Sequence, residues 1–148
     1  MKRFADYFDS LSGKWSLKRT ISSGEELTGE LIFKPAGDDA LFASEAGTLR
    51  LGNGNLVSAS RRWLWRYEFG ILKIFFVEEP LRLYHEFVPE FGNGNWHGNS
   101  HHSCDPDVYL GEYVFSPGRI SSEQIVSGPR KDLRIITECE RLEPNQTS

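Results

Sequence analysis

The sequence lacks a long apolar run and has only two cysteines in 148 residues. No stretch approaches the length of a membrane-spanning helix, and residues 1–11 are too polar to hold the apolar core of a secretory signal peptide. Without a secretory signal, Cys104 and Cys139 are expected to be reduced thiols. These absences predict a cytoplasmic protein with no membrane partner.

A surplus of basic residues is also absent, because the net charge is −4 at pH 7. A general nucleic-acid or anionic-membrane surface needs excess Lys and Arg to neutralise phosphates, so neither is expected. The outward strand positions show no evident apolar patch, which disfavours a protein-interaction module. Two local basic clusters, around Arg61 and around Arg130-Lys131, are typical of sites for small anions. We therefore expect a small-molecule ligand and a monomer or homodimer.

Aromatic residues are abundant at 13% of the sequence, and 148 residues suffice for one core of such large side chains. Short runs of β-branched and aromatic residues recur between Gly, Pro and Asn turn signals, as in an antiparallel meander. Only Phe4–Leu11 has helical spacing. Because Phe91–Pro106 is polar and rich in glycine, we predict a long functional loop there. The predicted strands cover residues 13–22, 27–34, 40–51, 56–69, 71–79, 81–88, 107–116, 119–127 and 130–142.

These strands predict an all-β fold with one domain over residues 1–148. We expect a single closed antiparallel lipocalin-like β-barrel that follows a short N-terminal helix. Closure removes the exposed edge strands that otherwise promote aggregation. An open two-sheet sandwich is the alternative.

Charged residues recur on the predicted inward faces of the strands. Alternation places Arg19, Glu45, Arg61 and Asp107 beside apolar neighbours. Because an isolated buried charge costs several kcal/mol, each must be paired, hydrated or bound to a ligand. An ion pair such as Arg19 with Glu45 is one explanation. However, three candidate interior arginines against two carboxylates leave a positive surplus, which an anionic or carbonyl-bearing ligand would balance.

The first and last strands carry a barrel signature. Gly13-Lys14-Trp15 opens the first strand after the helical segment, and Arg141 lies on the last. This arrangement resembles the calycin signature of lipocalins, in which a tryptophan plugs the closed barrel end beneath an arginine. A cation–π contact would join the two side chains. The resemblance implies structural roles for Trp15 and Arg141.

A more specific resemblance lies in residues 101–109 (His-His-Ser-Cys-Asp-Pro-Asp-Val-Tyr) and 128–132 (Gly-Pro-Arg-Lys-Asp). They resemble the uncharacterised domain of unknown function 6314 family, and the match extends through Gly13-x-Trp15 with Arg19, Glu45-x-Gly47 and Arg61-x-Trp63-x-Trp65. The resemblance implies a lipocalin-like barrel and adds little about chemistry. Leu133 and Gln124 replace a Tyr and a Trp of the family pattern, and Ser103 is an extra residue, so the pocket is expected to differ in shape.

Ligand binding in a barrel pocket is the leading functional hypothesis. Trp63, Trp65, Tyr67 and Tyr113 would form apolar walls, while arginines and Tyr109 would orient one polar end of the ligand. The ligand is expected to be small and hydrophobic or aromatic, with an acidic or carbonyl group. The predicted ligand-binding residues are Arg19, Glu45, Arg61, Trp63, Trp65, His102, Cys104, Asp107, Tyr109, Arg130 and Lys131.

An enzyme is the alternative, and the residues leave this question open. An isomerase, lyase or hydrolase would use His102 as general acid or base, oriented by Asp107, with Tyr109 or Arg61 polarising a substrate oxygen. Cys104 activated by His102 is a candidate nucleophile.

No metal or cofactor is predicted. The group of His97, His101, His102 and Cys104 does not match standard zinc spacing. An inward His85 could ligate haem, but a lone histidine is more often a hydrogen-bonded core residue.

Overall fold

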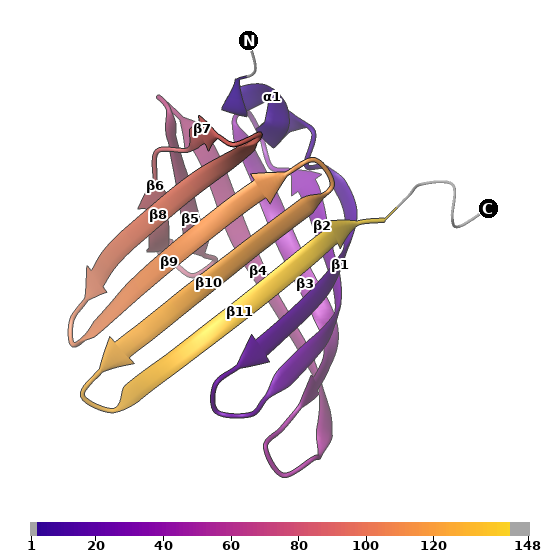
Figure 1. The fold of residues 1–148 in the computed structure, drawn as a ribbon, viewed down its shortest axis with the longest axis vertical. Coiled ribbons are helices and arrows are strands. Elements are labelled where there is room, and N and C mark those ends of the chain that lie inside the picture. Colours follow the sequence, from indigo (N-terminus) through magenta and orange to yellow (C-terminus); the bar gives the residue numbers. More distant parts are fainter. Residues whose placement is uncertain (1–2, 143–148) are drawn as a thin grey trace.

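Residues 3–142 are described by a computed structural model, in which the chain forms one curled antiparallel sheet preceded by a short helix (Figure 1). No helix within these residues is long and apolar enough to cross a membrane. The helix is α1 (Phe4–Asp9), and the strands are β1 (Gly13–Ile21), β2 (Glu26–Pro35), β3 (Ala40–Arg50), β4 (Leu56–Glu68), β5 (Ile71–Phe76), β6 (Arg82–Phe87), β7 (Glu90–Gly92), β8 (Asn95–Cys104), β9 (Asp107–Ser116), β10 (Arg119–Gly128) and β11 (Lys131–Arg141).

The strand order is β6-β5-β4-β3-β2-β1-β11-β10-β9-β8-β7, so the first long strand pairs with the last. In this pairing Trp15 lies opposite Arg141, and Ile21 opposite Ile135. Every neighbouring pair is antiparallel. The meander therefore curves back on itself, which confirms the predicted antiparallel all-β architecture.

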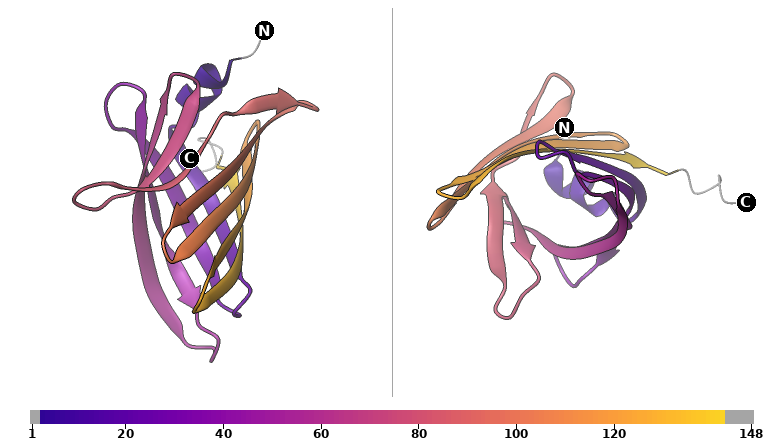
Figure 2. Two further views of the ribbon diagram at one scale, coloured as in Figure 1. Left: turned by 90° about the vertical axis from the view of Figure 1, so that its left-hand side faces the viewer. Right: turned by 90° about the horizontal axis from the view of Figure 1, so that it is seen from below.

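The curl brings β6 against β8, but no strand ladder joins them within residues 3–142. The Glu86 backbone N–H donates a hydrogen bond to Ser100 Oγ at 3.0 Å. The Phe87 ring lies so close to Gly98 that a Cβ there would clash. Viewed from below, the strands curve around the interior, with α1 beyond them (Figure 2). The described sheet is thus a strongly curled half-barrel, and the predicted full closure is not reached by backbone pairing.

The prediction of a long loop over Phe91–Pro106 is wrong, because most of this segment forms β7 and β8. Within residues 3–142, eleven strands therefore replace the predicted nine. Backbone hydrogen bonds to β9 hold β8 in place, with Trp96 opposite Phe115 and His102 opposite Tyr109. Such bonds do not require apolar side chains, so polar composition misled the prediction.

Helix α1 closes one end of the curled sheet (Figure 1). Phe4 and Phe8 lie one turn apart and, with Leu11, are buried in the same core as Phe33 and Phe115. A helix of six residues is too short to be stable alone, so this packing stabilises it.

Trp15 lies beneath Arg141 at this closed end. The indole is 1% exposed and donates its N–H to the Leu11 carbonyl at 2.9 Å. The Arg141 guanidinium lies 5.3 Å from the centre of the Trp15 ring and donates to the carbonyls of Ser10, Leu11 and Ser12. Together these contacts join the first strand, the last strand and the segment after α1.

Candidate ligand-binding cavity

The concave side of the curled sheet forms an open cavity of about 650 Å³, lined by side chains from β1 to β6 and from β9 to β11. Its lining reaches Leu49, Ala59 and Lys131, which lie at strand ends away from α1. This end is called the mouth below. The volume falls within the range of small-molecule pockets, about 300–1,000 Å³.

Seven of the eleven predicted ligand-binding residues line this cavity: Arg19, Glu45, Arg61, Trp63, Trp65, Tyr109 and Lys131. His102 stacks on Tyr109 with ring centres 6.3 Å apart, and Asp107 pairs with Lys131 at 3.6 Å, but neither belongs to the lining. Arg130 is exposed in the turn between β10 and β11. The side chain of Cys104 lies outside the described residues.

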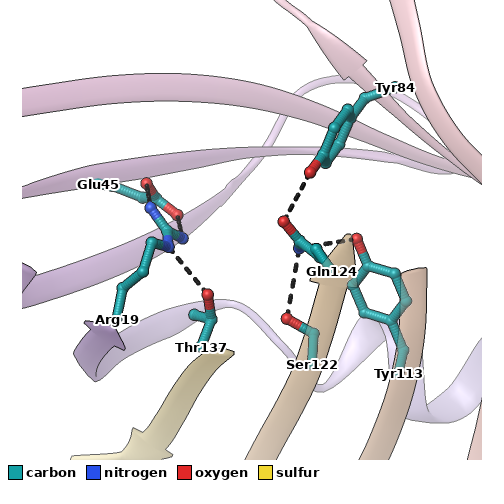
Figure 3. Close-up of polar contacts among 7 residues, drawn as sticks. All are labelled: Arg19, Glu45, Tyr84, Tyr113, Ser122, Gln124 and Thr137. Carbon is teal, nitrogen blue, oxygen red and sulfur yellow. Dashed lines mark hydrogen bonds and ion pairs between the residues drawn. The ribbon is translucent and has the colours of Figure 1, made fainter. Parts of the chain in front are cut away.

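Arg19 and Glu45 form a bidentate ion pair inside the cavity (Figure 3). The guanidinium nitrogens lie 2.9 and 2.7 Å from the carboxylate oxygens, and Arg19 Nε donates to Thr137 Oγ1 at 2.8 Å. Burial disfavours the charge on Arg19, but hydrogen bonding and attraction to Glu45 outweigh it and raise the Arg19 pKa. The two deepest charges therefore neutralise each other.

The unpaired positive charge of the cavity lining is on an exposed side chain, so the prediction of a buried surplus is wrong. Arg61 is exposed, with its guanidinium 5.4 Å from the Trp63 ring centre and 5.8 Å from that of Phe76. It lies opposite Glu45 in register, yet Glu45 pairs with Arg19. Within residues 3–142 Arg61 has no ion-pair partner. The remaining inward candidate, Arg141, lies over the closed end.

Aromatic rings make up much of the cavity wall. The Trp63 ring packs against Phe76 and Tyr84, with ring centres 4.9 and 5.1 Å apart. Trp65 packs edge-on against Phe33 at 5.0 Å, nearer the closed end. Such rings offer large apolar contact areas to a flat ligand.

A second polar network crosses the cavity (Figure 3). The Tyr84 hydroxyl donates to Gln124 Oε1 at 2.6 Å. Gln124 Nε2 donates to the Tyr113 hydroxyl at 3.3 Å and to Ser122 Oγ at 3.4 Å. The Tyr113 hydroxyl is also hydrogen-bonded to His85 Nδ1, at 2.6 Å. This network ties β6 to β9 and β10 across the interior.

Sequence reasoning missed Tyr84 because a β-bulge interrupts the alternation of β6. Ile74 pairs with His85 while Phe75 pairs with Leu83, so Tyr84 is an additional residue. Consequently Tyr84 and His85 are both buried, and their rings stack with centres 3.9 Å apart. Gln124 was identified only by its departure from the family pattern.

His85 is fully buried, and its Nε2 has no hydrogen-bond partner among the described residues. Its ring lies against Gly111, where a Cβ would come within 2.6 Å of it. Burial, with a smaller effect from the charge of His102, lowers the pKa of His85 to about 3. The ring is therefore neutral at ordinary pH. This enclosed, hydrogen-bonded ring does not fit a haem ligand.

The neutral His85 predicts how stability depends on pH. The unfolded chain protonates this histidine below pH about 6.5, whereas the folded chain resists protonation down to about pH 3. Between these values the free energy of unfolding is expected to fall by about 1 kcal/mol for each unit that the pH is lowered. Urea denaturation at pH 7, 6, 5 and 4 measures this slope. The His85→Gln variant should show a flatter slope of unfolding free energy against pH. The control His101→Gln, at an exposed site, should keep the wild-type slope. Equal slopes for the wild type and both variants would contradict the prediction.

The four candidate catalytic residues are only partly brought together. Arg61 and Tyr109 line the cavity, while His102 and Asp107 do not. No hydrogen bond in the described part of the chain joins any two of them, so no general base with its orienting partner is formed. Of the histidines weighed above as metal ligands, His101 is exposed on the face of β8 opposite to His102, and His97 Nε2 lies 3.0 Å from the Gly92 carbonyl.

Of the solved structures compared below, the one with a TM-score above 0.5 supports the barrel fold. EF1p2_mFAP2b bound to DFHBI is 14% identical, with a TM-score of 0.52 over 90% of this chain and 95% of its own. A redesigned β-barrel, mFAP1, bound to DFHBI, is 16% identical, with a TM-score of 0.44 over 90% of this chain and 97% of its own. At such identities the likeness concerns the fold alone.

No curated protein matches. The model of DUF6314, a family of unknown function, matches residues 11–141, and the chain belongs to this family.

Proposed function

We propose that this protein binds a small hydrophobic or aromatic molecule with an acidic or carbonyl group inside a lipocalin-like barrel. The cavity of about 650 Å³ carries this proposal, because it combines aromatic walls with few polar groups. The EF1p2_mFAP2b barrel, which shares the fold, is bound to DFHBI, and this is consistent with a ligand in the interior.

The charge distribution favours placing an acidic group at the mouth. The deep pair of Arg19 and Glu45 is neutral as a unit, so a carboxylate beside it would add an uncompensated buried charge. Arg61 instead offers an exposed guanidinium above the aromatic wall formed by Trp63 and Phe76. A ligand with an apolar body and an acidic tail fits this arrangement.

Calorimetric titration with 4-(2-naphthyl)butanoate and its neutral amide tests the proposal. We expect both compounds to bind. Arg61→Ser should weaken binding of the carboxylate by up to about fivefold, the value of an exposed ion pair, and leave the amide unaffected. The effect should diminish at high salt.

Arg62→Ser is the matched control, because it removes the same charge from a neighbouring side chain that lies over Phe42, outside the cavity lining. It should leave the binding of both compounds unchanged. If neither compound binds the wild-type protein, the proposed function is wrong. Equal effects of the two arginine variants would contradict the placement of the acidic group.

A further inference from the structure

Four polar side chains form a row across the cavity wall. In the strand register Tyr113 lies opposite Ser122, Ser122 opposite Thr137, and Thr137 opposite Arg19. Ser122 and Thr137 are therefore direct neighbours on β10 and β11, and Figure 3 shows them on the same side of these strands. They are 8% and 7% exposed, and both line the cavity.

Each of these two hydroxyl oxygens already accepts a hydrogen bond. Thr137 Oγ1 accepts from Arg19 Nε at 2.8 Å, and Ser122 Oγ accepts from Gln124 Nε2 at 3.4 Å. Each hydroxyl also carries one proton to donate. Within residues 3–142 neither proton has an acceptor. Two unused donors therefore adjoin the cavity at the same level.

The groups that bond to these hydroxyls are themselves held in place. Arg19 is fixed by both oxygens of Glu45, and Gln124 by the 2.6 Å bond from Tyr84. A hydroxyl that accepts a bond becomes a stronger donor, especially away from water. The unused donors are thus oriented and polarised before a ligand arrives.

We propose that Ser122 and Thr137 form a two-hydroxyl subsite for a neutral carbonyl oxygen of the ligand, an inference that rests on the proposed function. An acceptor is favoured because each hydroxyl still has its proton to donate, whereas one of the two lone pairs on each oxygen already accepts a bond. A neutral acceptor is favoured over a carboxylate because Glu45 already balances the positive charge of Arg19. The ligand class is consequently an aromatic ketone or related carbonyl compound, with any acidic group directed toward the mouth.

Two soluble compounds that differ only in the ketone test this subsite. They are 4-(2-naphthyl)-4-oxobutanoate and 4-(2-naphthyl)butanoate, titrated calorimetrically into the wild type and the double variant Ser122→Ala/Thr137→Val. The ratio of the two Kd values should shift by about tenfold against the ketone in the double variant, as expected for loss of one to two neutral hydrogen bonds. This ratio cancels any general change of the cavity, as in a double-mutant cycle.

Ser121→Ala is the matched control, because Ser121 precedes Ser122 on β10 and is absent from the cavity lining. It should keep the wild-type ratio. If the double variant does not fold, Ser122→Ala alone should shift the ratio by about threefold. An unchanged ratio in the folded variants overturns the subsite while the proposed function stands. No binding of either compound to the wild type overturns both.

Discussion

Glu45→Leu is expected to lower the free energy of unfolding by about 3–5 kcal/mol, the usual cost of removing one partner of a buried ion pair. The Glu45 side chain is 8% exposed, and that of Arg19 is 18% exposed. Without the carboxylate, the Arg19 guanidinium would keep only its bond to Thr137 and remain charged inside the cavity. Urea denaturation followed by tryptophan fluorescence measures the change.

The double variant Arg19→Met/Glu45→Leu is the matched control for this experiment. It replaces both charges by apolar side chains of similar size, so most of the lost stability should return. If Glu45→Leu alone stays within about 1 kcal/mol of the wild type, the pair is not buried as described. If the double variant is no more stable than the single one, packing at Glu45 matters more than charge.

Trp15→Ala should cost about 3–5 kcal/mol, because it removes a large side chain from the closed end and leaves a cavity. The change also removes the indole N–H bond to Leu11 and the ring beneath Arg141. Denaturation in urea gives the loss. Trp96→Ala is the control, because Trp96 is only partly buried and should cost distinctly less. Equal losses for the two tryptophans would contradict the role of Trp15 at the closed end.

Alternation along the strands predicted the residues of the cavity wall where strands are regular. On β1, β3 and β9 it placed Arg19, Glu45 and Tyr109 inward, and all three line the cavity. Alternation does not show how far a long side chain extends along the cavity. It therefore predicted a buried Arg61, although this side chain, which does line the cavity, is exposed.

Alternation along the strands also offered an ion pair of Arg19 with Glu45 as one explanation of the inward charges, and the structure contains this pair. Two other features depend on how strands pair and pack, and they were beyond sequence reasoning. The bulge that turns Tyr84 inward depends on the register between β5 and β6. Strand β8 depends on its ladder with β9, and its Gly98 makes room for Phe87. Neither of these two features leaves a periodic signal in the sequence.

The DUF6314 family has no known function, so membership of it does not identify a ligand. The kind of ligand is therefore inferred from the residues that line the cavity. The described residues combine aromatic walls, a neutralised ion pair, two unused hydroxyl donors and cationic groups at the mouth. Each part contributes a different element of recognition: apolar contact, orientation of a neutral oxygen, and attraction of an acidic tail.

Chemical-shift mapping by ¹H–¹⁵N NMR during titration with 4-(2-naphthyl)butanoate tests the central claim most directly. The account predicts saturable shifts at backbone amides of β1, β3, β4, β10 and β11, whose side chains line the cavity. No saturable shifts would contradict it. So would shifts confined to the outer cleft beside Tyr7, Phe91 and Trp96.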